Sequence, residues 1–297
     1  MNKELESVFN QFDADSKAVS FIELNSGHIN DTYLVRTDSK LSYVLQKMNG
    51  NVFENTSQLI NNKVLVSKHL QDKSSHLPKL EIYKKTLCFV ASKKEVFYHI
   101  DAANNYWNLT VFIENSVTYE KTPNARIAFE AGKAIGQFLD LTADFSSDTL
   151  FPILPDFHSV SKRYNQFLEA VEKASGIRRE QAKHLIHFVK QHRNEMLQID
   201  TAISQGKLPL RVTHNDTNIL FSKSDDFLCL IDTDTVMEGV IHFDYGDALR
   251  TICNTADEDC SDVSEIDFNI GYFKRFTEGF AQELKGAITK EEVQYLP

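Results

Sequence analysis

The chain has 297 residues, of which 42% are hydrophobic and 25% are charged, a balance typical of a folded globular protein. Lysine and arginine number 32 and aspartate and glutamate 42, so the net charge is −10. This negative excess argues against nucleic acid or an anionic membrane surface as a partner, because their phosphate groups would be repelled.

Cysteine spacing and the lack of long apolar runs narrow the class of protein further. The four cysteines form no CxxC pair, so the sequence predicts neither a zinc site nor a disulfide framework. The first six residues include acidic side chains where a secretory signal needs an apolar run. No 18 consecutive residues are apolar, so no membrane-spanning segment is expected. We therefore expect reduced thiols in a soluble, cytoplasmic protein.

The first third of the chain is rich in predicted strands. Apolar, β-branched and aromatic residues predict strands over 19–24, 33–35 and 41–48, and residues 52–71 form a helical pattern. Further short strands are predicted over residues 80–83, 86–91, 95–99 and 109–113.

The remainder is predominantly helical. Apolar residues spaced as on one helical face predict helices over 125–141, 158–174, 180–203 and 266–285. Short strands are predicted over 209–213, 219–222 and 227–231, the last two joined by a polar turn. The order of elements predicts an α+β protein of two lobes, a strand-rich lobe over residues 1–113 and a helix-rich lobe over 114–297.

Polar residues concentrate at the ends of two apolar strands, in residues 212–221 and 230–234. Phosphoryl transfer from a nucleotide needs one carboxylate that accepts the proton of the attacking hydroxyl, and further oxygen ligands for Mg²⁺. On this interpretation Asp216 is the base and Asp232 the main metal ligand. The structural interpretation, in which Asp216 and Asn218 cap a turn and Asp232 and Asp234 end a strand, is equally compatible with these residues alone.

Seven segments in order resemble the aminoglycoside phosphotransferase and choline kinase superfamily, which has a protein-kinase-like fold, and within it most closely the N-acetylhexosamine 1-kinases. They extend over roughly residues 20–285. The segments are residues 27–33, 43–49, 105–107, 112–116, 212–217, 231–237 and 243–247.

The resemblance assigns nucleotide-binding roles to the first lobe. Residues 27–32, with Gly27, Asn30 and Thr32, resemble the turn that covers the nucleotide, where backbone N–H groups approach phosphate. Either Lys47 or Gln46 falls near the strand position where this fold places a phosphate-binding lysine. Strand alternation directs only one of these two into the cleft.

The resemblance also places a hinge and a substrate pocket. Residues 112–116, with Phe112 and Glu114, resemble the hinge whose backbone meets adenine. His28 and Trp107 correspond to residues near the sugar, although a structural histidine and a core aromatic are the competing interpretations.

A second set of polar residues follows the metal segment. The resemblance implies that Asp244, Asp247 and Arg250 support the catalytic loop or reach substrate, and internal ion pairing is an equal alternative.

The sequence departs from the family pattern at three places. Asp216 and Asn218 are two residues apart, whereas family members have a longer loop between the base and the metal-binding asparagine, so Asn218 is a weaker candidate as second metal ligand. Residues 107–112 are less basic than the strand that precedes the hinge in relatives. Relatives also continue for several helices beyond the residue that corresponds to Pro297, so the end at Leu296-Pro297 resembles an interruption, and part of the substrate pocket would be missing if the chain stopped there.

These implications predict an ATP- and Mg²⁺-dependent kinase that phosphorylates the anomeric hydroxyl of an N-acetylhexosamine, a small-molecule sugar substrate. A kinase of another small alcohol, such as choline, an aminoglycoside or a different sugar, is the first alternative. A catalytically inactive nucleotide- or sugar-binding relative is the second, and it is motivated by the short Asp216–Asn218 spacing.

Overall fold

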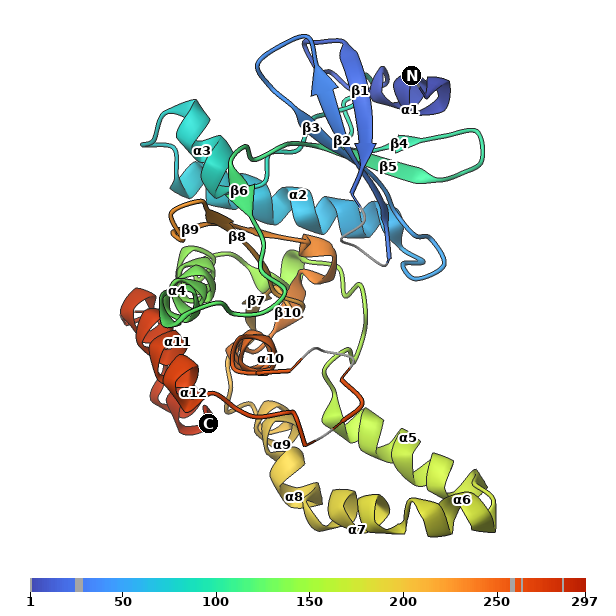
Figure 1. Cartoon of the computed structure of the whole chain (residues 1–297), viewed down its shortest axis with the longest axis vertical. Coiled ribbons are helices and arrows are strands. Elements are labelled where there is room, and N and C mark those ends of the chain that lie inside the picture. Colours follow the sequence, from blue (N-terminus) through green and yellow to red (C-terminus); the bar gives the residue numbers. More distant parts are fainter. Residues whose placement is uncertain (1, 25–28, 257–259, 263, 285) are drawn as a thin grey trace.

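The computed structural model describes residues 2–24, 29–256, 260–262, 264–284 and 286–297. A five-stranded sheet forms most of the N-terminal region and helices dominate the C-terminal region (Figure 1). This arrangement confirms the predicted α+β, protein-kinase-like fold class. Among the described residues, no helix is both long and apolar enough to cross a bilayer.

The N-terminal sheet is antiparallel throughout, with the strand order β1-β2-β3-β5-β4. Its strands are β1 (Ala18–Glu23), β2 (Asp31–Thr37), β3 (Tyr43–Lys47), β4 (His99–Ile100) and β5 (Tyr106–Val111). Helix α1 (Lys3–Phe9) lies against one face of the sheet, which we call the outer face, and packs there with buried Leu45 and Leu109. Helix α2 (Thr56–Lys73) lies on the opposite side, between the sheet and the C-terminal region (Figure 1).

The register of β3 decides which of its polar side chains faces which way. Gln46 pairs with Thr32 and Asn108, whereas the next residue, Lys47, pairs with Asp31 and Trp107. Because successive side chains of a strand point to opposite faces, Gln46 and Lys47 cannot share one. The hydrogen bond from α2 to Gln46 places Gln46 on the face toward α2, which we call the inner face.

Residues 79–85 correct the predicted strand over 80–83. They form helix α3 (Lys79–Lys85), which starts directly after Pro78. A proline just before or at the first turn, an acid in that turn and bases in the last turn all favour a helix, and here Glu81 is followed by Lys84 and Lys85. These end signals outweigh the short apolar run. The strands predicted over 86–91 and 95–99 are reduced to one isolated bridge, from Phe89 to Thr110, and the first residue of β4, His99.

The C-terminal core is built on two helices in close contact, α4 (Ala125–Leu141) and α11 (Ile270–Glu283). Gly132 and Gly279 permit this approach, because a Cβ atom there would lie 2.0 Å and 2.1 Å from backbone oxygens of the facing helix. Two small sheets lie beside the pair. One joins β6 (Ser116–Val117), β8 (Asn218–Ser222) and β9 (Phe227–Ile231), and the other joins β7 (Arg211–Thr213) and β10 (Met237–Gly239).

The remaining elements complete the C-terminal region. Helix α10 (Ile241–Ile252) follows β10, and α12 (Lys290–Gln294) lies near the end of the chain. Two short 3₁₀ turns are η1 (Ser147–Thr149) and η2 (Thr233–Thr235).

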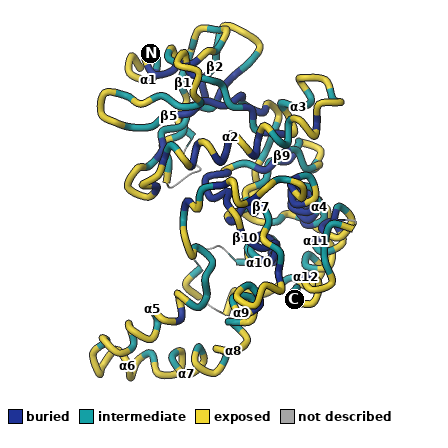
Figure 2. Tube along the Cα trace, turned by 180° about the vertical axis from the view of Figure 1, so that it is seen from behind, coloured by how far each residue is buried: buried dark blue, intermediate teal, exposed yellow. Residues whose placement is uncertain are grey.

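Residues 160–204 form an arm that projects from the body and is largely exposed (Figures 1 and 2). The predicted helix over 180–203 is interrupted, because Ala182, His192 and Leu197 have ψ between 3° and 7° and bend the chain. The arm consists of α5 (Val160–Lys173), α6 (Gly176–Gln181), α7 (Lys183–Gln191), α8 (Arg193–Met196) and α9 (Gln198–Ser204).

Candidate functional site

The loop that follows β7 is held by a buried carboxylate of helix α10. The backbone N–H groups of His214 and Asn215 donate to the two carboxylate oxygens of Asp244 at 2.9 Å and 2.7 Å. Asn215 has φ of 70°, a left-handed conformation that asparagine tolerates better than most residues. The loop therefore turns sharply at Asn215 and presents the next residue, Asp216, at the surface.

One helical turn further along α10, Asp247 supports the same loop. It accepts a hydrogen bond from the backbone N–H of Thr217 at 3.0 Å and forms an ion pair with Arg250 at 3.7 Å. Positions three apart lie on one helical face, so Asp244 and Asp247 act together on the loop. The structure thus places both carboxylates in loop support, and Arg250 lies exposed beside them.

Burial changes the acidity of Asp244. The side chain is fully buried, and desolvation raises its pKa to about 7 although the two N–H donors act in the opposite direction. The raised pKa of Asp244 is therefore a consequence of its exclusion from water.

Asp232 lies at the second strand end, within electrostatic range of Asp216. It has φ of 60° and starts the 3₁₀ turn η2 directly after β9. Desolvation by the surrounding protein raises the pKa of Asp232 to about 6, and the negative charges of Asp234 and Asp216 act in the same direction. The positive charge of Lys63 only partly opposes this rise. Solvent still reaches Asp232. A carboxylate that is accessible yet surrounded by like charges is suited to a cation.

Asp234 links the two lobes. Its carboxylate accepts a hydrogen bond of 2.6 Å from the amide of Asn30 and forms a buried ion pair with Lys63 of α2. The other side of Asn30 accepts from the backbone N–H of Asn49 at 2.9 Å. Asn30, a predicted nucleotide-covering residue, therefore fastens the start of β2 to the segment that carries Asp232.

Lys63 is the functional candidate that sequence reasoning missed. Its side chain is 4% exposed, and its ammonium group also donates to Gln46 Oε1 at 3.3 Å. The same amide oxygen accepts from Asn108 at 3.4 Å, and the Gln46 amide lies 3.5 Å from the hydroxyl of Thr32. The available signal was a lysine on the apolar face of a predicted helix, three and four residues after Ile60 and Leu59.

Lys47 and Trp107, which were expected beside phosphate and sugar, both lie on the outer face, opposite Gln46. Lys47 forms an ion pair with Asp31 at 3.4 Å and lies 6.0 Å from the centre of the Trp107 ring. Trp107 is 3% exposed, belongs to the core under α1 and donates from its indole nitrogen to Asp101 at 2.9 Å. Leu45 of β3 and Leu109 of β5 are apolar and pack on this face. Lys47 and Trp107 are each two residues from one of these leucines in the same strand, so their side chains point to the same face.

The predicted hinge connects the N-terminal sheet to β6. Phe112 donates its backbone N–H to Ser42 at 2.8 Å, and its ring lies 5.4 Å below the guanidinium of Arg36. Arg36 also forms an exposed ion pair with Glu114. The two predicted hinge residues thus share one partner in β2, at the point where the chain leaves the sheet.

Asn218 begins β8 and pairs with Ile231, so it stands opposite the residue that precedes Asp232. The short loop therefore still brings Asn218 to the strand end where Asp232 lies. Gly27 and His28 lie outside the described residues.

His158 is a second residue that the sequence did not indicate. It precedes α5, and its Nε2 atom lies 2.9 Å from the backbone carbonyl of Asn215. A carbonyl only accepts, so Nε2 carries the proton. Burial lowers the pKa of His158, which keeps the ring neutral, and the ring packs on Phe157 and Phe243.

The oxygen donors of this cluster fit a hard divalent cation. Mg²⁺ is commonly held by one or two carboxylates together with substrate phosphates, and Asp232 supplies one such carboxylate. Within the described part of the chain, no three His, Cys, Asp or Glu side chains form a ready metal cage. The protein donors alone would therefore leave positions for nucleotide oxygens.

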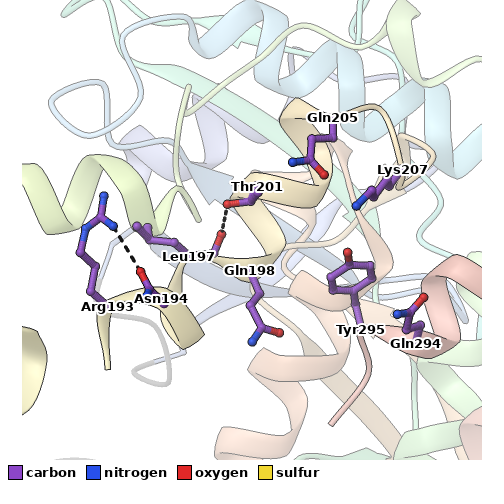
Figure 3. A pocket seen from close by; sticks show the side chains of 9 residues that line it. All are labelled: Arg193, Asn194, Leu197, Gln198, Thr201, Gln205, Lys207, Gln294 and Tyr295. Carbon is purple, nitrogen blue, oxygen red and sulfur yellow. Dashed lines mark hydrogen bonds between the residues drawn. The ribbon is translucent and has the colours of Figure 1, made fainter. Parts of the chain in front are cut away.

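A cavity of about 590 Å³ lies apart from these residues, between α8, α9 and α12 (Figure 3). Its nine lining side chains are mostly polar, and none of the predicted site residues is among them. Hydrogen bonds join lining residues in two places, from Arg193 to the side chain of Asn194 at 3.4 Å and from the Thr201 hydroxyl to the backbone carbonyl of Leu197 at 2.7 Å (Figure 3). The lining residues are Arg193, Asn194, Leu197, Gln198, Thr201, Gln205, Lys207, Gln294 and Tyr295.

A model of the phosphotransferase enzyme family matches residues 20–276. Among solved structures, a microcompartment-associated aminopropanol kinase is 11% identical with a TM-score of 0.64, over 98% of this chain and 82% of that one. Amicoumacin kinase in complex with AMP-PNP, Ca²⁺ and Ami is 14% identical with a TM-score of 0.60, over 95% and 80%. An aminoglycoside phosphotransferase from Alicyclobacillus acidocaldarius is 10% identical with a TM-score of 0.58, over 97% and 80%. At these identities the structures establish a shared fold.

Proposed function

Since the chain belongs to the phosphotransferase enzyme family, we propose that it is an ATP-dependent kinase that phosphorylates the anomeric hydroxyl of an N-acetylhexosamine. The observation that carries the proposal is the convergence of Asp216 and Asp232 at two adjacent strand ends, where each carboxylate lies in the field of the other. Phosphoryl transfer depends mainly on positioning and on charge stabilisation, and this pair offers both.

Asp216 would orient the acceptor hydroxyl and take its proton as the bond to phosphorus forms. Its exposed position on a loop fixed by Asp244 and Asp247 supports that role. Asp232, with Asn218 as the candidate second ligand, would hold Mg²⁺. Bound Mg²⁺ would neutralise charge on the nucleotide phosphates.

Lys63, rather than Lys47, is the cation that we propose for the nucleotide side of the site. It lies on the inner face, bound to Asp234 two residues after the metal ligand. Thr32 and Gln46 line the same face, and residues 112–116 would meet the adenine. Arg250, next to Asp247, would approach the acceptor.

The choice of an acetylated hexosamine rests on the segments 27–33 and 232–237, which resemble N-acetylhexosamine 1-kinases. Their contact through Asn30 and Asp234 supports treating them as one functional unit. A second candidate, a kinase of a cationic alcohol, is favoured by the carboxylates Asp216, Asp232 and Asp247 at the site, which would attract an amine. Two solved structures of similar fold are named as kinases of aminopropanol and of aminoglycosides.

Consumption of ATP with N-acetylglucosamine, N-acetylgalactosamine, galactose, choline and aminopropanol separates these proposals. Turnover with an acetylated hexosamine and formation of a 1-phosphate, followed by ³¹P NMR, are expected. Turnover only with an amine would favour the second candidate. Binding of ATP without turnover on any acceptor would contradict both and would indicate an inactive relative.

A further inference from the structure

A second cavity, of about 300 Å³, lies between α2, α4 and β9, and none of the predicted site residues lines it. Its walls are mainly apolar and include Leu70 of α2, Phe138 and Leu141 of α4, and Phe227 and Leu230 of β9. Small-molecule sites begin at about this volume and are typically apolar with a few polar groups. The polar groups present here therefore define what the cavity could bind.

The charges at this cavity are all basic. Lys73, His76 and Lys85 line it, and no aspartate or glutamate does. Lys73 is paired with Asp144 at 2.5 Å, whereas Lys85 has no carboxylate within salt-bridge distance in the described residues. Burial raises the pKa of the Cys229 thiol on β9, and the charge of Lys85 acts against that rise, so its field reaches the cavity wall. The anionic group of a ligand in this cavity could therefore form an ion pair with Lys85.

Thr233 connects the cavity to the candidate site. It lines the cavity and is 7% exposed, and its hydroxyl has no hydrogen-bond partner among the residues that the structure describes. Buried hydroxyl groups usually have a hydrogen-bond partner, and one without a partner destabilises the folded state. Thr233 stands between Asp232 and Asp234, so any molecule that contacts it also contacts the turn η2 that positions both carboxylates.

We propose that the cavity between α2, α4 and β9 is a binding site for a small, largely apolar acid, whose anionic group pairs with Lys85 and whose occupancy alters the Asp232–Asp234 turn through Thr233. The apolar walls hold the body of the molecule, and Lys85, the lining lysine without a carboxylate partner in the described residues, selects an acid over a neutral or basic compound. The proposed binding of an acid does not depend on the proposed function. The proposed effect on the Asp232–Asp234 turn rests on that function only because it assigns nucleotide and metal to Asp232.

Decanoate is a suitable probe, measured by isothermal titration with the full chain. We expect saturable 1:1 binding, at least tenfold weaker binding of decan-1-ol, which lacks the charge, and at least tenfold weaker binding of decanoate to Lys85→Glu. Lys84→Glu carries the same charge change on a neighbouring residue that does not line the cavity and should bind as the wild type does. Leu77→Trp, at the half-buried edge of the cavity, should abolish binding by filling it.

The proposed site would be overturned if decanoate bound equally to the wild type, Lys85→Glu and Leu77→Trp. It would also be overturned if decanoate did not bind the wild type saturably. Coupling is measured as the change in decanoate affinity upon saturation with Mn²⁺ and AMP-PNP, and a change of about fivefold or more is expected. An unchanged affinity would overturn the coupling. Neither titration involves turnover, so failure of the kinase proposal would be detected separately, in the acceptor assay.

Discussion

The two faces of the N-terminal sheet hold similar polar residues in opposite settings. On the inner face, Lys63 is buried and bound to Asp234, and Gln46 completes the contact. On the outer face, Lys47 is 32% exposed beside Asp31 and packs near Trp107. The inner pair joins the sheet to the segment of Asp232, whereas the outer pair joins two strands of one sheet. The difference supports the proposal that Lys63 on helix α2, rather than Lys47 on β3, is the lysine of the nucleotide side.

The largest expected effect is on catalysis at Asp216. Asp216→Asn removes the proton acceptor and should lower kcat by at least about 100-fold, the scale of general-base catalysis, with little change in ATP affinity. Asp140→Asn changes an exposed aspartate of α4 and serves as the matched control. Turnover of Asp216→Asn within a few fold of Asp140→Asn would remove Asp216 from the mechanism.

The two lysines give the most direct contrast between the faces. Lys63→Met leaves Asp234 buried without its cation and should lower the free energy of unfolding by about 3–5 kcal/mol. Lys47→Met breaks a partly exposed pair and should cost at most about 1 kcal/mol. Urea unfolding measures both, and ATP affinity should fall by about tenfold or more for Lys63→Met only. The same loss of ATP affinity in both variants would show that the faces do not differ in function.

A pH dependence tests Asp232, in the segment that the inner face contacts through Asp234. Folding raises the pKa of Asp232 from 3.8 to about 6. Between pH 3.8 and about 6, the folded protein therefore binds more protons at this residue than the unfolded chain does. The contribution of Asp232 to the free energy of unfolding falls as pH rises through that window. Asp232→Asn without metal should therefore gain more in Tm over the wild type at pH 8 than at pH 4.

Metal binding provides the second readout of the same residue. Mn²⁺ affinity of the wild type should increase as pH rises through about 6, because the ligand must be deprotonated. A pH-independent affinity, or an equal Tm difference at pH 4 and pH 8, would exclude Asp232 as the titrating ligand.

The smallest effect is expected on the outer face. Burial alone would raise the pKa of Asp101, but hydrogen bonds from Trp107 and Asn105 lower it to about 2. Trp107→Phe removes one of them, so it should reduce stability by about 1 kcal/mol near pH 7, with the difference shrinking as pH falls from about 4 to 2. kcat and acceptor KM should not change. A raised KM for the sugar would return Trp107 to the substrate site.

The periodic spacing of apolar residues predicted the strands and helices that bury one face. Strands β1 to β3 and helix α4 were found because alternating or helical apolar patterns reflect one buried face. The same reasoning failed at α3, where the end signals of Pro78 and Lys84–Lys85 mattered more than the apolar residues. It also left Gln46 and Lys47 undecided, since alternation separates two neighbours without indicating which face meets the cleft.

Candidate residues could be proposed where polar residues concentrate in a short segment beside an apolar strand, as they do around Asp216 and again around Asp232. Lys63 was not, because its partner lies 171 residues away and a lysine on a helix has no sequence signature of pairing. His158 likewise contacts the loop only through the backbone carbonyl of Asn215, a contact that no side-chain pattern encodes.

The most direct test of the account is ³¹P NMR of the wild type and Asp216→Asn with ATP and N-acetylglucosamine or N-acetylgalactosamine, after ATP binding to both has been measured by titration. Both proteins should bind ATP, and only the wild type should form a sugar 1-phosphate. Equal product formation by Asp216→Asn, or no phosphorylated product from a wild type that binds ATP, would contradict it.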